Sequence, residues 1–196
     1  GDAFGVIDKG WKNRMNRRYE LLAPCHFGLE AVLKKEIIDL GYEISQVEDG
    51  RVTFIGDAEA ICRANVFLRT AERILLKVGS FTAISFEELF QGTKNIPWED
   101  YIPQDGKFWV AKASSIKSKL FSPSDIQSVM KKAMVERMKS CYGVNWFAEN
   151  GSAYPLRLFL YKDNVTIVMD TSGDSLHKRG YLTMTSRAPI TETLAA

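Results

Sequence analysis

Glycine-rich loops, paired cysteines and long apolar runs are all missing from this sequence of 196 residues. No two of its 14 glycines lie one residue apart, which excludes the G-x-G loops that bind phosphates and dinucleotides. Its three cysteines form no C-x-x-C pair, so neither a zinc site nor a disulfide framework is indicated. No apolar run approaches the roughly 18 residues of a membrane-spanning helix. We therefore expect a globular protein of the reducing cytoplasm, without a membrane partner.

Catalytic side chains are also scarce. The sequence holds two histidines, and its carboxylates are scattered rather than spaced as an acid–base pair. His26 directly follows Cys25, and such a pair can act as base and nucleophile. Neighbours in sequence rarely face each other usefully, so we interpret both residues as structural and keep the nucleophile pair as the alternative. We expect no catalytic residue, cofactor site or metal site in this chain.

What the sequence does contain is a normal core and an uneven charge. Hydrophobic residues make up 45% and charged residues 26%, which is typical of a folded globular chain. The net charge is only +2, but residues 107–139 hold eight basic residues against Asp125 and Glu136. That segment is therefore +6 and the rest of the chain −4, which favours a polyanion partner or, as the alternative, a solvated helix face. The eight are Lys107, Lys112, Lys117, Lys119, Lys131, Lys132, Arg137 and Lys139.

The first part of the chain has the pattern of a β-α-β-β-α-β unit. Gly41 ends the first helix, Asp49-Gly50 predicts a hairpin, and Asp57 is placed to cap the second helix. The expected elements are a strand at 18–23, a helix at 27–40, strands at 44–47 and 52–55, a helix after residue 57, and a strand at 73–81. The helix positions predicted to face inward are Leu29, Val32, Leu33, Ile37, Leu40, Ile61, Ala64, Phe67 and Leu68.

The second part mixes helices and strands. Ser122 is a helix cap, Pro123 suits the first position and Asp125 completes the cap, while Lys162-Asp163 predicts a hairpin turn. The expected elements are a helix at 85–89, a loop over 91–106, a strand at 108–113, a helix from 123 to about 140, and strands at 154–161 and 164–170. The long helix has an apolar stripe, which predicts core packing rather than a methionine-rich binding surface: Ile126, Val129, Met130, Ala133, Met134 and Met138.

Three stretches resemble the THUMP-containing RNA methyltransferases. Pro24–Glu30 follows the first strand, Ser118–Gln127 runs into the long helix, and Asp174–Tyr181 is followed by Ala188-Pro189-Ile190 and Glu192–Ala196. The last stretch resembles the junction between the THUMP domain and the catalytic domain in the bacterial enzymes that methylate the exocyclic amine of a guanine in large-subunit ribosomal RNA. An older name for such proteins is adenine-specific DNA methylase.

The resemblance implies an α+β protein with a ferredoxin-like domain at 15–82 and a THUMP α/β domain at 83–182. Residues 1–14 would be a leader before Met15, and residues 183–196 a linker and the first helix of a Rossmann-like methyltransferase domain. That domain, truncated here, would bind S-adenosylmethionine. The sequence has no adjacent prolines, so the Asn-Pro-Pro-aromatic motif of amino methyltransferases is not in this chain.

The resemblance implies that the chain binds structured RNA, in particular ribosomal RNA, and positions it for the missing C-terminal domain. A polar, basic loop leads into the start of the long helix, where free N–H groups and the helix dipole favour phosphate. The predicted RNA-binding residues are Lys112, Ser114, Ser115, Lys117, Ser118, Lys119, Lys131, Lys132, His177, Lys178 and Arg179. For His177 and Arg179, at the domain junction, the alternative role is to fix the angle between domains.

Tryptophans could add base stacking to this surface. Trp109 lies in an expected strand and is predicted to be a core residue. Trp98 and Trp146 lie in expected loops, and whether they stack on bases is left open. A different function also remains, because a fold alone does not decide function. A ferredoxin-like domain that binds a small regulatory ligand would show an anion or metabolite pocket and no salt-sensitive RNA binding. One that binds another protein through its strand edges would instead dimerise and be indifferent to charge reversal at Lys117 and Lys119.

Overall fold

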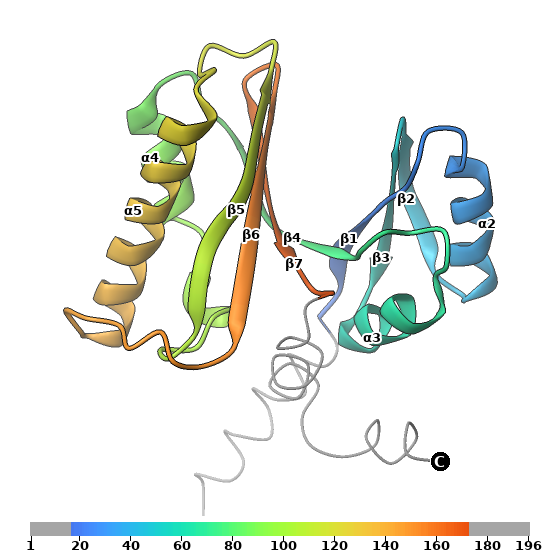
Figure 1. Cartoon of the computed structure of the whole chain (residues 1–196), viewed down its shortest axis with the longest axis horizontal. Helices are drawn as coiled ribbons and strands as arrows, with labels where there is room; N and C mark the ends of the chain where they lie inside the picture. Colours follow the sequence, from blue (N-terminus) through green and yellow to red (C-terminus); the bar gives the residue numbers. More distant parts are fainter. Residues whose placement is uncertain (1–16, 173–196) are drawn as a thin grey trace, which may run out of the picture. The chain divides into compact units, whose positions relative to one another are not determined.

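A computed structural model describes residues 17–172, which form two compact units that are considered separately (Figure 1). Within the described range, the first unit holds residues up to Leu76 together with Thr171 and Ser172, and the second is Lys77–Asp170. His177, Lys178 and Arg179 lie outside the described residues, as do the expected leader and the expected junction with a following domain.

The first unit has the predicted β-α-β-β-α-β order. Its strands are hydrogen-bonded in the order β2-β3-β1-β4, and each of these pairings is antiparallel. This is the ferredoxin-like arrangement, with α2 and α3 on one face of the sheet (Figure 1). The elements are β1 (Tyr19–Pro24), α2 (Glu30–Asp39), β2 (Glu43–Glu48), β3 (Arg51–Gly56), α3 (Ala58–Phe67) and the start of β4 (Leu75–Thr82).

Three positions predicted to be buried in this unit are instead exposed. Leu29, Val32 and Phe67 are 39%, 51% and 58% exposed. Leu29 precedes α2, which begins three residues later than predicted, and Phe67 is the last residue of α3. The apolar stripe of α2 is narrow, because Leu33 and Ile37 fill the contact with the sheet and leave Val32 beside it. The apolar pattern in the sequence predicted both helices correctly but assigned too many residues of each helix to its buried face.

The second unit places two helices on one face of a sheet ordered β4-β7-β6-β5 (Figure 1). Strands β5 and β6 are parallel, and β6 and β7 form the predicted antiparallel hairpin. Among the described strands, β5 lies at the edge. The elements are α4 (Phe86–Lys94), the short 3-10 turn η1 (Trp98–Asp100), β5 (Lys107–Ile116), α5 (Pro123–Tyr142), β6 (Ala153–Tyr161) and β7 (Asn164–Asp170).

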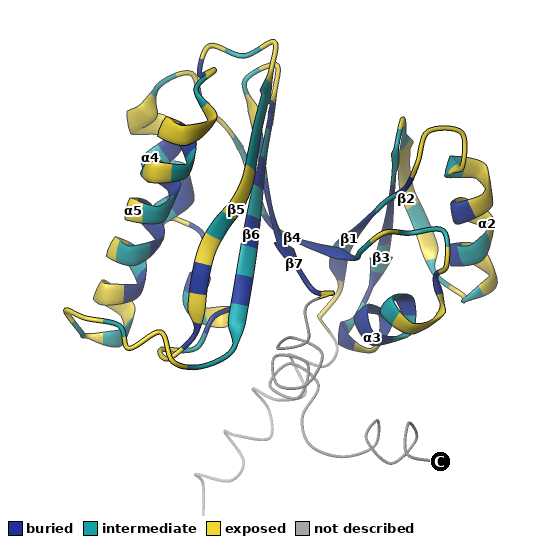
Figure 2. Cartoon of the chain, in the orientation of Figure 1, coloured by how far each residue is buried: buried dark blue, intermediate teal, exposed yellow. Residues whose placement is uncertain are grey.

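Helix α5 supplies much of the core of the second unit (Figure 2). Ser122 caps it as predicted, since the hydroxyl accepts a hydrogen bond from the Asp125 N–H at 3.4 Å. The residues of its stripe that are fully buried are Ile126, Met130, Ala133, Met134 and Met138, so the methionines are core residues. Within residues 17–172, no helix combines the length and apolar character needed to cross a membrane.

The prediction that Trp109 is a core residue was wrong, and Trp98, which the sequence left open as a stacking candidate, is a core residue. Trp98 is fully buried, and its indole N–H donates to the carbonyl of Thr93 at 2.8 Å. This segment is not the expected loop, because α4 continues to Lys94 and the η1 turn folds Trp98 beneath it. Trp109, expected in the core, is 38% exposed on β5. Of these two tryptophans, the exposed one is therefore Trp109 in strand β5.

An ion pair ties the η1 turn to α5. The Arg137 guanidinium donates to both carboxylate oxygens of Glu99, at 2.7 and 3.1 Å. The two side chains are 29% and 25% exposed, so water screens the contact only partly. Hydrogen bonds from Arg137 hold the pKa of Glu99 at about 2, below its usual value of 4.5. One member of the basic segment is thus used inside the fold.

Glu99→Gln should therefore lower the free energy of unfolding at pH 7 by about 1–3 kcal/mol. Because the pKa of Glu99 is lowered in the folded state, its stabilisation is complete above pH 4.5 and is lost as the pH falls toward 2. Urea unfolding of both proteins at pH 7 and near pH 3 measures this. Glu136→Gln, which breaks the more exposed 3.0 Å pair with Lys94, is the matched control and should change little. A deficit that is equal at both pH values would contradict the prediction.

Candidate nucleic-acid interface

The loop between β5 and α5 is tied to the β6–β7 turn by three hydrogen bonds. The N–H of Lys119 donates to the carboxylate of Asp163 at 2.9 Å, and the N–H of Asp163 donates to the hydroxyl of Ser118 at 3.0 Å. The N–H of Lys162 donates to the carbonyl of Ile116 at 3.1 Å. These bonds place two short segments side by side, although 45 residues separate Ser118 from Asp163 in the chain.

Both segments turn sharply through left-handed backbone. Lys162 and Asp163 have φ values of 47° and 66°, as in the tight turn that suits the twist of a hairpin. Lys117 has φ 50° and reverses the chain as it leaves β5. Such values disfavour side chains other than Gly, Asn or Asp, so two lysines are held here at positions where lysine is unusual. Each turn directs its lysine outward from a fixed backbone.

Lys117, Lys119 and Lys162 are exposed and together form what we call the basic corner. In the part of the chain that the structure describes, no acidic side chain pairs with any of the three. Exposed ammonium groups without an acidic partner are available to phosphate oxygens. The basic corner therefore has the charge and the accessibility of a phosphate-binding surface.

Aromatic and aliphatic side chains surround the basic corner. Phe121, between Lys119 and the start of α5, is 80% exposed, and Ile116 and Tyr161 are 56% and 49% exposed. Phe121, Tyr161 and Lys162 are not among the site residues predicted from the sequence. The turn at residues 162–163 was recognised, but only the pairing of β5 with β6 shows that it lies beside the β5–α5 loop. Exposed rings next to lysines suit unpaired bases as well as phosphates.

Several predicted RNA-binding residues have internal partners. The hydroxyl of Ser115 donates to the carbonyl of Leu120, and that of Ser118 donates to the carbonyl of Ile116 at 2.9 Å. Both hydroxyls thus shape the loop. Lys112 is exposed and Ser114 half-buried on β5, while Lys132 is exposed on α5.

Lys131 is engaged within the second unit. Its ammonium donates to the carbonyl of Phe108, lies 3.7 Å from the centre of the Phe108 ring, and pairs with Glu149 at 3.3 Å. Of the lysines predicted from the sequence, the structure brings Lys117 and Lys119 together and directs Lys131 elsewhere. The contacts of the Lys131 ammonium with the carbonyl and the ring of Phe108 explain this.

The start of α5 offers less to phosphate than we predicted. Pro123 has no N–H, and the N–H of Asp125 is taken by the Ser122 hydroxyl. The N–H of Ile126 donates to the Ser122 carbonyl at 3.0 Å. This leaves the N–H of Ser124 as the one first-turn donor without a partner among the described residues, and the Asp125 carboxylate opposes an anion. The electrostatic attraction for phosphate therefore comes mainly from the lysines of the basic corner and not from the start of α5.

The alternative of a Cys25–His26 catalytic pair gains no support. Cys25 is buried, and burial together with Glu30 and Glu72 raises the pKa of its thiol, which makes it a poor nucleophile. His26 is exposed and lies 3.3 Å from a carboxylate oxygen of Glu72. Glu30 accepts a hydrogen bond from the N–H of Gly50 at 2.9 Å and so ties α2 to the β2–β3 turn. Within residues 17–172, no three His, Cys, Asp or Glu side chains gather as metal ligands.

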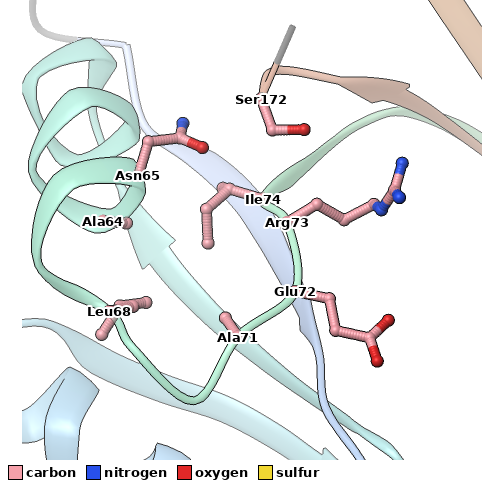
Figure 3. A pocket seen from close by; sticks show the side chains of 8 residues that line it. All are labelled: Ala64, Asn65, Leu68, Ala71, Glu72, Arg73, Ile74 and Ser172. Atoms are coloured by element: carbon pink, nitrogen blue, oxygen red, sulfur yellow. The ribbon is translucent and has the colours of Figure 1, made fainter.

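A hollow in the first unit bears on the small-ligand hypothesis (Figure 3). Its volume is about 290 Å³, at the lower limit for ligand sites. The amide of Asn65 donates to the Ile61 carbonyl at 2.8 Å and the Thr171 hydroxyl at 3.1 Å, and Glu72 pairs with His26. These polar groups hold the fold, so they indicate no particular ligand. The lining residues are Ala64, Asn65, Leu68, Ala71, Glu72, Arg73, Ile74 and Ser172.

Both units match known protein families. Residues 20–75 match the RlmL ferredoxin-like domain, and residues 83–170 match the THUMP domain. The chain combines an RlmL ferredoxin-like domain with a THUMP domain. The basic corner thus belongs to the THUMP domain, and the hollow to the ferredoxin-like domain.

The relatives of this domain pair are methyltransferases. The chain is 50% identical over 182 residues to "Putative RNA methyltransferase YpsC" of Bacillus subtilis, covering 92% of the chain and 47% of the relative. It is 33% identical to the ribosomal RNA large subunit methyltransferase K/L of Psychromonas ingrahamii, covering 88% of the chain and 23% of that protein. A solved structure of "a possible methylase" from Clostridium difficile 630 is 50% identical, with a TM-score of 0.78, covering 91% of the chain and 47% of that chain. The chain thus spans about half the length of YpsC and about a quarter of K/L.

Substitution of Asp163 tests the hydrogen bonds between the two segments. Loss of its negative charge should favour RNA binding, whereas loss of the loop shape that it fixes should weaken RNA binding. Asp163→Ala removes the acceptor for the Lys119 N–H, so this amide should exchange with solvent at least about tenfold faster. RNA affinity should fall, although the change removes a negative charge. Hydrogen exchange and RNA titration of the same sample measure both effects.

Asp163→Asn is the matched control. It removes the same charge but keeps a side-chain oxygen acceptor, and asparagine tolerates the positive φ. Exchange at Lys119 should stay close to that of the unchanged protein. If Asp163→Ala binds RNA as tightly as Asp163→Asn, the fixed loop shape contributes nothing to binding.

Proposed function

We propose that this chain is the RNA-binding part of an S-adenosylmethionine-dependent ribosomal RNA methyltransferase. The THUMP domain would hold structured RNA, while methyl transfer to the exocyclic amine of a guanine takes place in a C-terminal domain. The family match and the names of the relatives support this proposal. A further related structure, "SMU.472, a putative methyltransferase complexed with SAH", supports S-adenosylmethionine as the cofactor of the parent protein.

The observation that carries the proposal is the basic corner. Lys117, Lys119 and Lys162 are exposed, lack acidic partners among the described residues, and extend from backbone that hydrogen bonds already hold. Contacts from such lysines to phosphates give affinity and orientation without reading sequence. A fixed backbone also loses little conformational freedom when RNA binds. The basic corner would therefore orient an RNA helix or loop rather than select a base.

The arrangement of domains is part of the same proposal. We place the ferredoxin-like domain at 15–82 and the THUMP domain at 83–182, with residues 183–196 leading toward the catalytic domain. His177, Lys178 and Arg179 would then extend RNA binding toward the reacting base. The matches at 20–75 and 83–170 support the two domains.

Charge reversal at the basic corner tests the function. The double variant Lys117→Glu, Lys119→Glu should weaken binding of a ribosomal RNA hairpin at least about tenfold. It should also flatten the dependence of log affinity on log salt by about 0.7–0.9 for each phosphate that is no longer neutralised. Fluorescence anisotropy between about 50 and 200 mM salt measures both quantities.

The matched control is Lys34→Glu, Lys35→Glu on α2, where both lysines are exposed. It makes the same change in net charge within the ferredoxin-like domain. If both double variants weaken binding equally, the chain attracts RNA through its overall charge and the basic corner is not the site. If the unchanged chain binds no RNA at low salt, the small-ligand or protein-interaction function takes precedence.

A further inference from the structure

The face of the second sheet opposite α4 and α5 carries an aromatic side chain on β5. Phe108 points toward the helices, because its ring lies against Lys131 and edge-on to Phe147, with ring centres 6.2 Å apart. Successive strand residues point to opposite faces, so Trp109 points away from the helices. It is 38% exposed, and exposed segments of β5 are seen in Figure 2.

A bulge turns Lys112 to the same face. The pairing of β5 with β6 shifts between Val110 and Lys112 and leaves Ala111 as an extra residue. Lys112 therefore lies opposite Arg157, on the face of Trp109, whereas unbroken alternation would point it toward α5. No acidic side chain pairs with Lys112 in the described residues, while Arg157 lies 4.0 Å from Asp170.

The alternation after the bulge brings Ile116 to this face, opposite Tyr161. Six register steps along β6 separate the partner of Trp109 from Tyr161, which corresponds to about 20 Å at a rise of about 3.3 Å per residue. Lys112 lies between these two rings. We call the row formed by Trp109, Lys112, Ile116 and Tyr161 the β5 track. The β5 track is exposed, with an aromatic ring at each end and Lys112 in the middle.

Each aromatic ring of the β5 track has a lysine beside it. The ammonium of Lys107 lies 5.9 Å from the centre of the Trp109 ring, and that of Lys162 lies 5.3 Å from the centre of the Tyr161 ring. Lys162 is also part of the basic corner, so the β5 track begins where the basic corner ends. Rings flanked by cations are the arrangement with which proteins bind single-stranded nucleic acid, through stacked bases and neighbouring phosphates.

We propose that the β5 track binds a single-stranded segment of the RNA whose structured part is held by the basic corner. Unpaired bases stack on Trp109 and Tyr161, and the phosphates between them lie at Lys112. A duplex cannot use the track in this way, because its bases are already stacked and paired. This inference rests on the proposed function and adds to it a class of substrate: a helix or hairpin with an unpaired extension.

Two RNAs distinguish the β5 track from the basic corner: a hairpin, and the same hairpin with an unpaired extension of about six nucleotides. The full chain should bind the extended RNA about tenfold or more tightly than the hairpin. Trp109→Ala should remove most of this gain and leave hairpin affinity unchanged, and Tyr161→Ala should also remove most of the gain. Trp109→Phe, which keeps a ring, should retain most of it.

Trp146→Ala is the matched control, since Trp146 is 76% exposed in the loop after α5 and is not part of the β5 track. The increase in RNA affinity that the unpaired extension gives to this variant should equal the increase for the unchanged chain. Circular dichroism checks the fold of each variant. If Trp109→Ala fails to fold, Tyr161→Ala and Lys112→Glu still test the track, because their side chains are exposed.

The outcomes separate the two proposals. An extension that adds no affinity, or a gain that survives Trp109→Ala or Tyr161→Ala, overturns the β5 track and leaves hairpin binding at the basic corner standing. Equal loss of hairpin and extended RNA affinity in Trp109→Ala also overturns it. Failure of both RNAs to bind the unchanged chain overturns both proposals, and the exposed track is then a surface for another protein.

Discussion

The candidate interface depends on one interaction, the hydrogen bond between the Lys119 N–H and the Asp163 carboxylate. It joins the loop before α5 to the turn after β6, and the Ser118 and Lys162 bonds complete the tie. The pairing of β5 with β6 brings the two segments side by side, and this bond fixes the loop that carries Lys117 and Lys119 against the turn that carries Lys162. The positions of the three lysines are thus set by backbone geometry, and the entropy cost of ordering the loop is met when the chain folds.

The basic residues of the second unit divide into two groups with different tasks. Arg137 and Lys131 face partners inside the unit, and their contacts stabilise η1, α5 and β5. Lys112, Lys117 and Lys119 face solvent without acidic partners in the described range. An uneven charge in the sequence thus reflects structure and binding together. Which of these basic side chains face partners and which face solvent depends on their positions in the folded strands and helices, and composition alone does not predict it.

Local signals in the sequence predicted the elements well, because they act through neighbouring residues. Asp57 and Ser122 cap the helices they were expected to cap, and Lys162-Asp163 forms the expected turn. Burial was less predictable, since it depends on residues distant in the chain. Trp98 is enclosed by a helix that extends further than its pattern suggested, and Phe121 is exposed although flanked by ordered structure. The sequence therefore identified the β5–α5 loop and the β6–β7 turn, but not that the two lie side by side.

The bulge at Ala111 determines which changes β5 can tolerate. A substitution at this exposed extra residue leaves the register of the strand intact. Deletion of the same residue would remove the bulge and let Lys112 follow Val110 directly, just as their partners Leu156 and Arg157 follow each other on β6. Every later side chain of β5 would keep its face, so Lys112 and Ile116 would stay on the face of Trp109. Only a strand in which Ala111 took a paired position would turn Lys112 and Ile116 toward α5. The faces of β5 therefore depend on Ala111 staying outside the pairing and not on its presence, so relatives should tolerate both its replacement and its loss.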